Sequence, residues 1–187
     1  MQANIIHSHS FTPIFNQNSK VLILGSFPSI TSETFGFYYG NSNNRFWSVL
    51  ACVFNEVLPT SKDRHLQNKE IIKIQSDFLL THHIALWDCV QTCKRKANNS
   101  SDTNLEILSF NDIARLVSKS QISTIFCNGK LARKAFDTLC SHHKDQTPNN
   151  NTILNLPIFT LPSTSSANAR YKLEALIKEW SILKEFL

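Results

Sequence analysis

The chain contains 187 residues, of which 42% are hydrophobic and 18% are charged. This length supports one domain with a real hydrophobic core, expected over residues 1–187, and the composition excludes disordered and fibrous proteins. The apolar runs are too short to span a bilayer, and the N-terminus has no basic segment leading into an apolar signal core. We therefore expect a cytoplasmic protein with no membrane partner. The formal net charge of +5 is compatible with a polyanionic partner and equally with a solvated basic surface.

The predicted elements begin with residues 1–19, which we expect to form a packed lead-in without a helix or strand. A strand is predicted at residues 20–27, because residues 21–24 are continuously apolar, as is typical of a strand covered on both faces. Apolar residues then recur at intervals of three and four in residues 44–54. This spacing predicts a helix with Asn44 near its N-cap.

Three further strands are predicted from short apolar runs, at residues 84–87, 122–127 and 158–161. Helices are predicted from helical spacing, at residues 69–80, up to about residue 119, at 130–140 and at the C-terminus. Residues 91–104 are basic and poor in apolar side chains, which indicates a surface loop. Ser109 and Asp112 resemble a capping box, and Ser166 or Asn168 is expected to cap the last helix.

Four units of strand, loop and helix predict an α/β fold with three layers, α/β/α, and a short four-stranded parallel sheet. Ligands of such sheets bind beyond the carboxyl ends of the strands. Asp88 stands where the second predicted strand ends, so its carboxylate could bind the edge of a ligand there.

The loop that leaves the first strand is rich in groups that build a pocket. It contains three of the chain's four glycines, which permit close backbone approach. It also holds aromatic rings and amide side chains, namely Phe27, Phe35, Phe37, Tyr38, Tyr39, Asn41, Asn43 and Asn44. Flat faces combined with amides, which both donate and accept hydrogen bonds, suit a planar heterocycle.

The five cysteines form no dense framework, so we expect reduced thiols. Cys89 and Cys93 are the only close pair, and the other three are scattered along the chain, which disfavours an iron–sulfur cluster. No histidine stands at zinc-ligand spacing to that pair. We therefore expect no metal and no cofactor.

Two long motifs, GSFPS followed by GFYYGNSNNRFW and then LPSTSSANAR near the end, resemble the uracil-DNA glycosylase superfamily, most closely its hypoxanthine (deoxyinosine) branch. WDCV at residues 87–90 and CNGK at residues 127–130 extend the resemblance over most of the chain. The resemblance implies the same three-layer fold. It also implies a DNA glycosylase of base excision repair, which flips a deaminated base out of double-stranded DNA and hydrolyses its N-glycosidic bond.

The resemblance also assigns roles to individual residues. Asn44 would be catalytic and position the attacking water or the leaving base, although its position alone is equally explained by helix capping. The residues expected to bind the base are Gly25, Ser26, Phe27, Tyr39 and Asp88, with Tyr39 and Phe27 as candidates for stacking. The residues expected to contact DNA are Ser163, Thr164, Ser165, Ser166 and Asn168, in a turn that could equally serve only to cap a helix.

Departures from the superfamily pattern bear on the substrate. Phe27 stands where other branches carry an acidic or amide residue, the second motif lacks a histidine, and Ser165 replaces an apolar wedge. Strong uracil activity is therefore not expected, and hypoxanthine is the preferred base, with uracil or xanthine as the alternative. Neither motif contains a lysine, which indicates a monofunctional enzyme.

A hypothesis from another class is a nucleic-acid-binding module without turnover, since aromatic rings, amides and a basic surface would serve that too. A Rossmann-like nucleotide-binding protein is disfavoured, because both G-x-G-x-x-G and the P-loop pattern are absent. We expect a monomer, because one small domain must surround one lesion.

Overall fold

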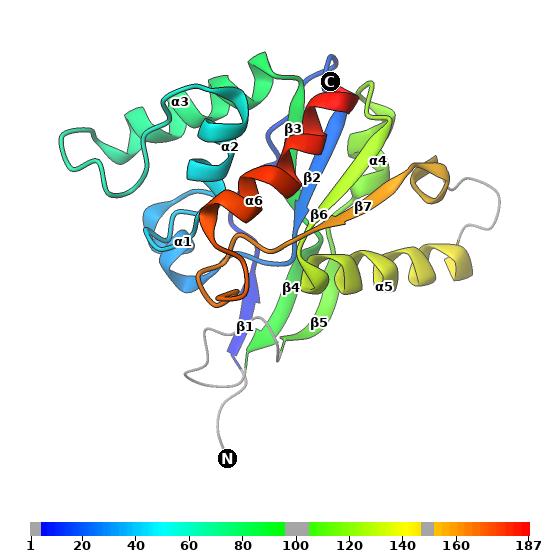
Figure 1. The fold of residues 1–187 in the computed structure, drawn as a ribbon. Helices are drawn as coiled ribbons and strands as arrows, with labels where there is room; N and C mark the ends of the chain where they lie inside the picture. The colour runs from blue at the N-terminus through cyan, green and yellow to red at the C-terminus, as the bar shows by residue number, and fades with distance from the viewer. Residues whose placement is uncertain (1–4, 96–104, 147–151) are drawn as a thin grey trace.

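The structure, a computed structural model, describes residues 5–95, 105–146 and 152–187 (Figure 1). The strands in these ranges are β1 (Ile5–Ser8), β2 (Val21–Gly25), β3 (Ile84–Asp88), β4 (Val90–Arg95), β5 (Leu105–Phe110), β6 (Thr124–Asn128) and β7 (Ile158–Leu161). The helices are α1 (Ile30–Phe35), α2 (Phe46–Phe54), α3 (Asn68–Thr81), α4 (Ile113–Ser118), α5 (Lys130–Gln146) and α6 (Leu173–Trp180), with 3₁₀ turns at Thr152–Asn155 and Ser181–Phe186.

The central sheet is parallel and has the strand order β3-β2-β6-β7. All five residues of β2 are buried, which is why its sequence is continuously apolar. Each of the four predicted strands of this sheet is confirmed to within a few residues. The predicted fold class, α/β with a four-stranded parallel sheet, is also confirmed.

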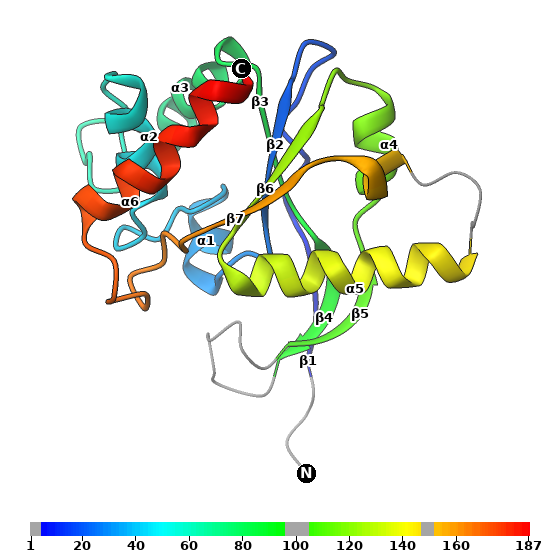
Figure 2. The same cartoon turned by 45° about the vertical axis from the view of Figure 1, so that its right-hand side comes forward.

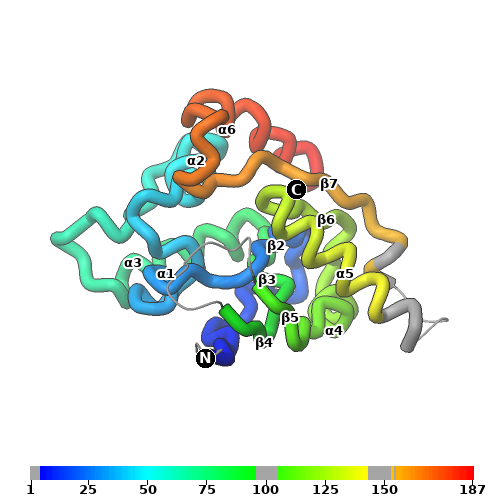
Figure 3. Tube along the Cα trace, turned by 90° about the horizontal axis from the view of Figure 1, so that it is seen from below, coloured from blue at the N-terminus to red at the C-terminus, as the bar shows by residue number. Residues whose placement is uncertain are grey.

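Helices cover both faces of this sheet (Figures 1 and 2). Along β2, Val21 and Ile23 pack into the core under α2, α3 and α6, whereas Leu22 and Leu24 pack into the core under α4 and α5. Seen from below, the strands lie between these two groups of helices (Figure 3). The alternating side chains of one strand therefore supply both cores, which defines the three layers.

A second, antiparallel sheet with the order β1-β4-β5 was not predicted. The expectation of a lead-in without a strand is wrong for β1, and the expected loop at residues 91–104 is wrong up to Arg95; the rest of that loop lies outside the described residues. Residues 5–8 and 92–95 are strands because they pair with each other. β4 follows β3 after one residue, Cys89, so the chain passes directly from one sheet into the other.

Two predicted caps are also wrong. Ser109 lies in β5, and the side chain of Asp112 alone caps α4 by accepting from the Arg115 N–H. The C-terminal helix α6 begins only at Leu173, with Lys172 at the N-cap, so Ser166 and Asn168 belong to a loop before it. The side chain of Asn168 bonds inside that loop instead, as described below. No helix in the described ranges is long and apolar enough to cross a membrane.

Candidate active site

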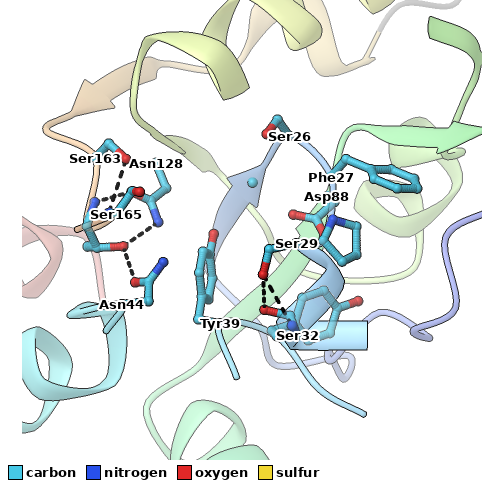
Figure 4. A pocket seen from close by; sticks show the side chains of 14 residues that line it. Ser26, Phe27, Ser29, Ser32, Tyr39, Asn44, Asp88, Asn128, Ser163 and Ser165 are labelled. Carbon is cyan, nitrogen blue, oxygen red and sulfur yellow. Dashed lines mark hydrogen bonds between the residues drawn. The ribbon is translucent and has the colours of Figure 1, made fainter. Parts of the chain in front are cut away.

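A hollow opens at the carboxyl ends of β2, β3 and β6 (Figure 4). It is lined by the loop after β2, the loop after β7 and the last residues of β3 and β6, namely Gly25, Ser26, Phe27, Pro28, Ser29, Ser32, Tyr38, Tyr39, Asn44, Asp88, Asn128, Ser163, Thr164 and Ser165. Including the open solvent at its mouth, the hollow encloses about 530 Å³. The structure thus brings both sequence motifs to one site.

Asn44 is held with its amide nitrogen toward the hollow (Figure 4). Its Oδ1 accepts from the Phe46 N–H at 3.0 Å and from the Thr164 hydroxyl at 2.9 Å. A backbone N–H can only donate, so this pair of bonds identifies the oxygen and leaves Nδ2 as the group facing the cavity. Because both lone pairs of the oxygen are engaged, Asn44 meets a ligand as a hydrogen-bond donor. The capping role and the site role therefore coexist.

Thr164 connects Asn44 to Asn128. Thr164 is fully buried, its N–H donates to Asn128 Oδ1 at 3.0 Å, and its hydroxyl accepts from Asn128 Nδ2 at 3.0 Å. That hydroxyl then donates its single hydrogen to Asn44, so each group in the chain of bonds has one defined direction. The DNA contact predicted for the Thr164 side chain does not fit this burial. The side chain instead orients Asn44.

Arg45 joins the two motifs. Its backbone N–H and its Nε donate to the Thr164 carbonyl, at 3.0 and 3.4 Å. Its terminal nitrogens donate to the carbonyls of Ser165, Asn168 and Tyr171. A rigid guanidinium fork suits such a cluster of carbonyls better than a lysine would. The loop after β7 is thereby fixed against the start of α2.

Tyr39 lies against the hollow with its ring stacked on Phe46, with ring centroids 4.0 Å apart and an interplanar angle of 25°. Its φ of 53° lies in the left-handed region, which is unusual for a bulky residue and is held by the surrounding packing. Phe27 differs, because its ring points away from the hollow (Figure 4) and is buried with Arg95 above its face, 5.0 Å from the ring centroid. Phe27 thus lines the hollow mainly with its backbone.

Asp88 is the one acidic residue among the described residues that line the hollow. One of its oxygens points toward the cavity (Figure 4), and a Cβ placed on Gly25 would lie 2.0 Å from that Oδ1. Glycine is therefore required at position 25. The other oxygen, Oδ2, lies 2.8 Å from Nε2 of His9. Burial, and secondarily the charge of Asp88, raises the pKa of the Tyr38 phenol far above its usual range.

The loop after β7 presents polar groups beside the hollow. Ser163 Oγ accepts from the Ser165 N–H, Ser165 Oγ accepts from the Ala167 N–H, and Asn168 donates to the Ser163 carbonyl at 2.9 Å. Ser166 is exposed. Since these serine oxygens accept from the backbone, their hydroxyl hydrogens are what they can offer an anion.

Three residues of this site were not predicted from the sequence. Asn128 ends β6 as Asp88 ends β3, so the strand-end rule that found Asp88 could have found it. Arg45 was visible inside NRFW, but nothing local shows which carbonyls it binds. His9 follows a strand that was itself missed and carries no sequence signal.

No three His, Cys, Asp or Glu side chains in the described part of the chain are grouped so as to hold a metal ion. Cys89 and Cys127 are buried as free thiols. Burial raises the pKa of Cys127 to about 12 and that of Cys89 well above its ordinary range, which makes both poor nucleophiles and poor ligands.

Comparison with known proteins identifies the family. Residues 12–184 match the sequence profile described as the Uracil DNA glycosylase superfamily. Two similar proteins are named Hypoxanthine DNA glycosylase. One, from Methanosarcina barkeri (strain Fusaro / DSM 804), is 30% identical over 121 residues, covering 64% of this chain and 70% of the relative. The other, from Methanosarcina acetivorans, is 29% identical over 162 residues, covering 86% and 88%.

A similar fold is found in a solution NMR structure from Methanosarcina acetivorans, described as a candidate uracil DNA glycosylase. It has a TM-score of 0.69 and 24% sequence identity, and the alignment covers 96% of this chain and 99% of that one. The site and these matches define the chain as a DNA glycosylase, a hydrolase of N-glycosidic bonds. The chain belongs to the uracil DNA glycosylase superfamily. The family and the enzyme class predicted from the motifs are thereby confirmed.

Proposed function

We propose that this glycosylase releases hypoxanthine from deoxyinosine in double-stranded DNA. The observation that carries the proposal is that a donor, Asn44 Nδ2, and an acceptor, Asp88 Oδ1, face the same hollow beside an aromatic ring. The names of the two Methanosarcina relatives support this choice of base. Uracil and xanthine, which also carry ring N–H groups, are the alternative substrates.

Base binding follows from the groups lining the hollow. The flipped base stacks on Tyr39, and its N1–H donates to the carboxylate of Asp88. The carbonyls of Gly25 and Ser26 are taken by the N–H groups of Cys89 and Val90, each at 3.0 Å. The exocyclic oxygen of the base therefore meets N–H groups of residues 25–27, which is the role we assign to Ser26 and the backbone of Phe27.

Catalysis rests on Asn44. When the N-glycosidic bond breaks, negative charge develops on the leaving base and positive charge on the sugar. Nδ2 donates a hydrogen bond to the base as this charge develops, and Thr164 keeps the amide from rotating. No lysine stands among the described residues of the hollow, which supports a monofunctional hydrolysis without a Schiff base.

DNA is held on the serine-rich side of the hollow. Ser163, Ser165, Ser166 and Asn168 donate to phosphate oxygens beside the flipped nucleotide. We propose that the protein acts as a monomer and without a metal, since every group that this mechanism uses comes from one chain.

The decisive experiment compares wild type with Asn44→Ala and Asn44→Asp on duplexes containing one deoxyinosine or one deoxyuridine. Alkali then cleaves the abasic sites, and a filter or mobility assay measures DNA binding. Loss of one such donor lowers rates by about 10²–10³, so Asn44→Ala should lose base release and keep its DNA affinity. Asn44→Asp should be equally slow, because it puts an acceptor where the donor stood.

The matched control is Asn55→Ala, which removes an amide at the far end of α2, where no pocket-lining residue lies. This variant should release hypoxanthine at the wild-type rate. If wild type releases uracil faster than hypoxanthine, uracil replaces hypoxanthine as the proposed substrate. If wild type binds these duplexes and releases no base, the proposed activity is refuted.

A further inference from the structure

His9 lies beneath the base-binding carboxylate, in the segment after β1. Its side chain is 1% exposed and that of Asp88 is 6% exposed, with Nε2 and Oδ2 2.8 Å apart. The rings of Phe11, Phe27 and Tyr38 surround the imidazole at centroid distances of 5.6, 5.9 and 6.0 Å. A buried carboxylate that has one hydrogen-bonding side chain beside it depends strongly on that side chain.

The backbone of Phe11 offers Nδ1 of His9 both a hydrogen-bond acceptor and a donor. Nδ1 lies 3.0 Å from the Phe11 carbonyl and 3.2 Å from the Phe11 N–H. Nδ1 can therefore accept from that N–H, and in an imidazolium it can donate to that carbonyl. In either arrangement Nε2 carries a hydrogen that faces Asp88.

No other described cation reaches Asp88. Arg95 is directed elsewhere, because its guanidinium lies over the Phe27 ring, donates to the Pro28 carbonyl and lies 3.9 Å from Glu33. The other titratable groups around the carboxylate are the phenols of Tyr38 and Tyr39 and the thiol of Cys89, and burial keeps the pKa values of Tyr38 and Cys89 high. His9 is thus the partner that holds Oδ2 of Asp88, which leaves Oδ1 toward the hollow.

We propose that His9 is a specificity-determining positioning residue, which keeps Asp88 a pure hydrogen-bond acceptor so that the site selects bases with a hydrogen on the ring nitrogen. This inference rests on the proposed function. Deamination of adenine converts N1 from an acceptor into an N–H donor, and deamination of cytosine does the same at N3. An ionised Asp88 accepts from the deaminated ring and repels the lone pair of the normal one.

The contact between Asp88 and the base thus depends on the ring nitrogen that deamination changes. Guanine also has a hydrogen on N1, so its exclusion depends on contacts near C2. Without His9, Oδ2 of the buried carboxylate would lose its hydrogen-bond partner, and Oδ1 would no longer be held toward the hollow. The acceptor that favours a ring N–H would then not be fixed in place, and the preference for a ring N–H would be lost.

The test measures single-turnover base release from duplexes with deoxyinosine or with purine 2′-deoxyriboside, whose N1 has no hydrogen. The variants are His9→Leu, which removes the donor, and His9→Gln, whose amide can place an N–H near the position of Nε2. His7→Leu is the matched control, because it makes the same change two residues earlier, outside the hollow. Hydrogen bonds to charged groups are worth roughly tenfold to hundredfold in such comparisons.

We expect His9→Leu to lose about tenfold to hundredfold on deoxyinosine and little on the purine nucleoside, so that their rate ratio collapses. His9→Gln and His7→Leu should keep the wild-type ratio. A purely structural role for His9 would lower both rates equally. A folded His9→Leu that keeps the wild-type ratio therefore overturns the inference, whereas a wild type that releases no hypoxanthine refutes the proposed function itself.

His9→Leu could fail to fold, which near-ultraviolet circular dichroism would show. The wild-type protein then still tests the role of His9. Long-range nitrogen–proton NMR of the labelled histidines shows which ring nitrogen of His9 bears hydrogen. A hydrogen on Nε2, together with a wild-type rate ratio in His9→Gln, supports the inference. An Nε2 without hydrogen means that Asp88 carries the proton, and this result overturns it.

Discussion

Thr164 donates its hydroxyl hydrogen to the amide oxygen of Asn44 at 2.9 Å, across 120 positions of the chain. This bond joins the first motif to the second and determines which end of the amide faces the substrate. Because Asn128 holds Thr164 from the other side, the orientation is supported by three side chains on three separate segments. Preorganised donors of this kind lower a barrier without reorganisation during the reaction.

Replacing Thr164 by valine should therefore slow the chemical step while leaving DNA binding almost unchanged. Loss of one hydrogen bond of ordinary strength predicts a rate about tenfold lower. Thr164→Ser keeps the hydroxyl and should retain most of the activity. Single-turnover base release and DNA affinity, measured side by side, provide the check; a Thr164→Val enzyme as fast as wild type would contradict the orienting role.

Gly25→Ala should abolish activity through Asp88. The added methyl carbon would lie 2.0 Å from Asp88 Oδ1 and 2.9 Å from the Tyr39 hydroxyl, so both site groups must move. We expect base release to fall by at least about 10²-fold, as for loss of a preorganised site group. Gly36→Ala is the comparison, because its Cβ meets nothing but its φ of 91° disfavours alanine. That variant should lose stability and keep its rate.

Tyr39→Leu should weaken the capture of the flipped base. Stacking of one base on an aromatic ring is worth about 1–3 kcal/mol, so affinity for a deoxyinosine duplex should fall by roughly tenfold to hundredfold. Tyr39→Phe keeps the ring and its stack on Phe46, and should bind nearly as wild type does. If both variants lose the same affinity for the deoxyinosine duplex, the hydroxyl of Tyr39 binds the base and the ring does not. Fluorescence anisotropy with deoxyinosine and undamaged duplexes measures the difference.

Stability should decline at alkaline pH because of the buried thiol of Cys127. Burial raises its pKa to about 12 in the folded protein, from about 9 in the unfolded chain. The unfolded state then loses its proton first, so this contribution to stability is complete below about pH 9 and is lost as pH rises from 9 toward 12. The free energy of unfolding in urea at pH 8, 9 and 10 tests this.

Cys127→Ala should show a shallower decline over that pH range, although the small cavity that it leaves lowers its stability at pH 8. Cys52→Ala, at an exposed thiol, should keep the wild-type slope. The raised pKa values of Cys89 and Tyr38 act in the same direction, so some decline remains in every variant. If the free energy of unfolding declines with pH as steeply in Cys127→Ala as in wild type, the Cys127 thiol is not a source of that decline.

Local sequence patterns were sufficient to predict the parallel sheet and most of the helices that cover it. Residues 21–24 are apolar without interruption because β2 is covered on both faces, and this covering is recorded in the sequence itself. The strand-end rule placed Asp88 at the hollow for the same reason: parallel strands deliver their carboxyl ends to one edge. The motifs placed Asn44 and the loop after β7 at one site.

Tertiary structure alone decided which strands pair and which partners the buried polar side chains have. The polar residues of β4 form a strand because β1 and β5 lie on either side of it, and Arg95 is buried because it holds the Pro28 carbonyl. His9 gains its partner Asp88 from 79 positions away. Periodicity in a sequence records which side chains avoid water, whereas a buried polar group is defined by its hydrogen-bond partner, which only the folded chain brings within reach.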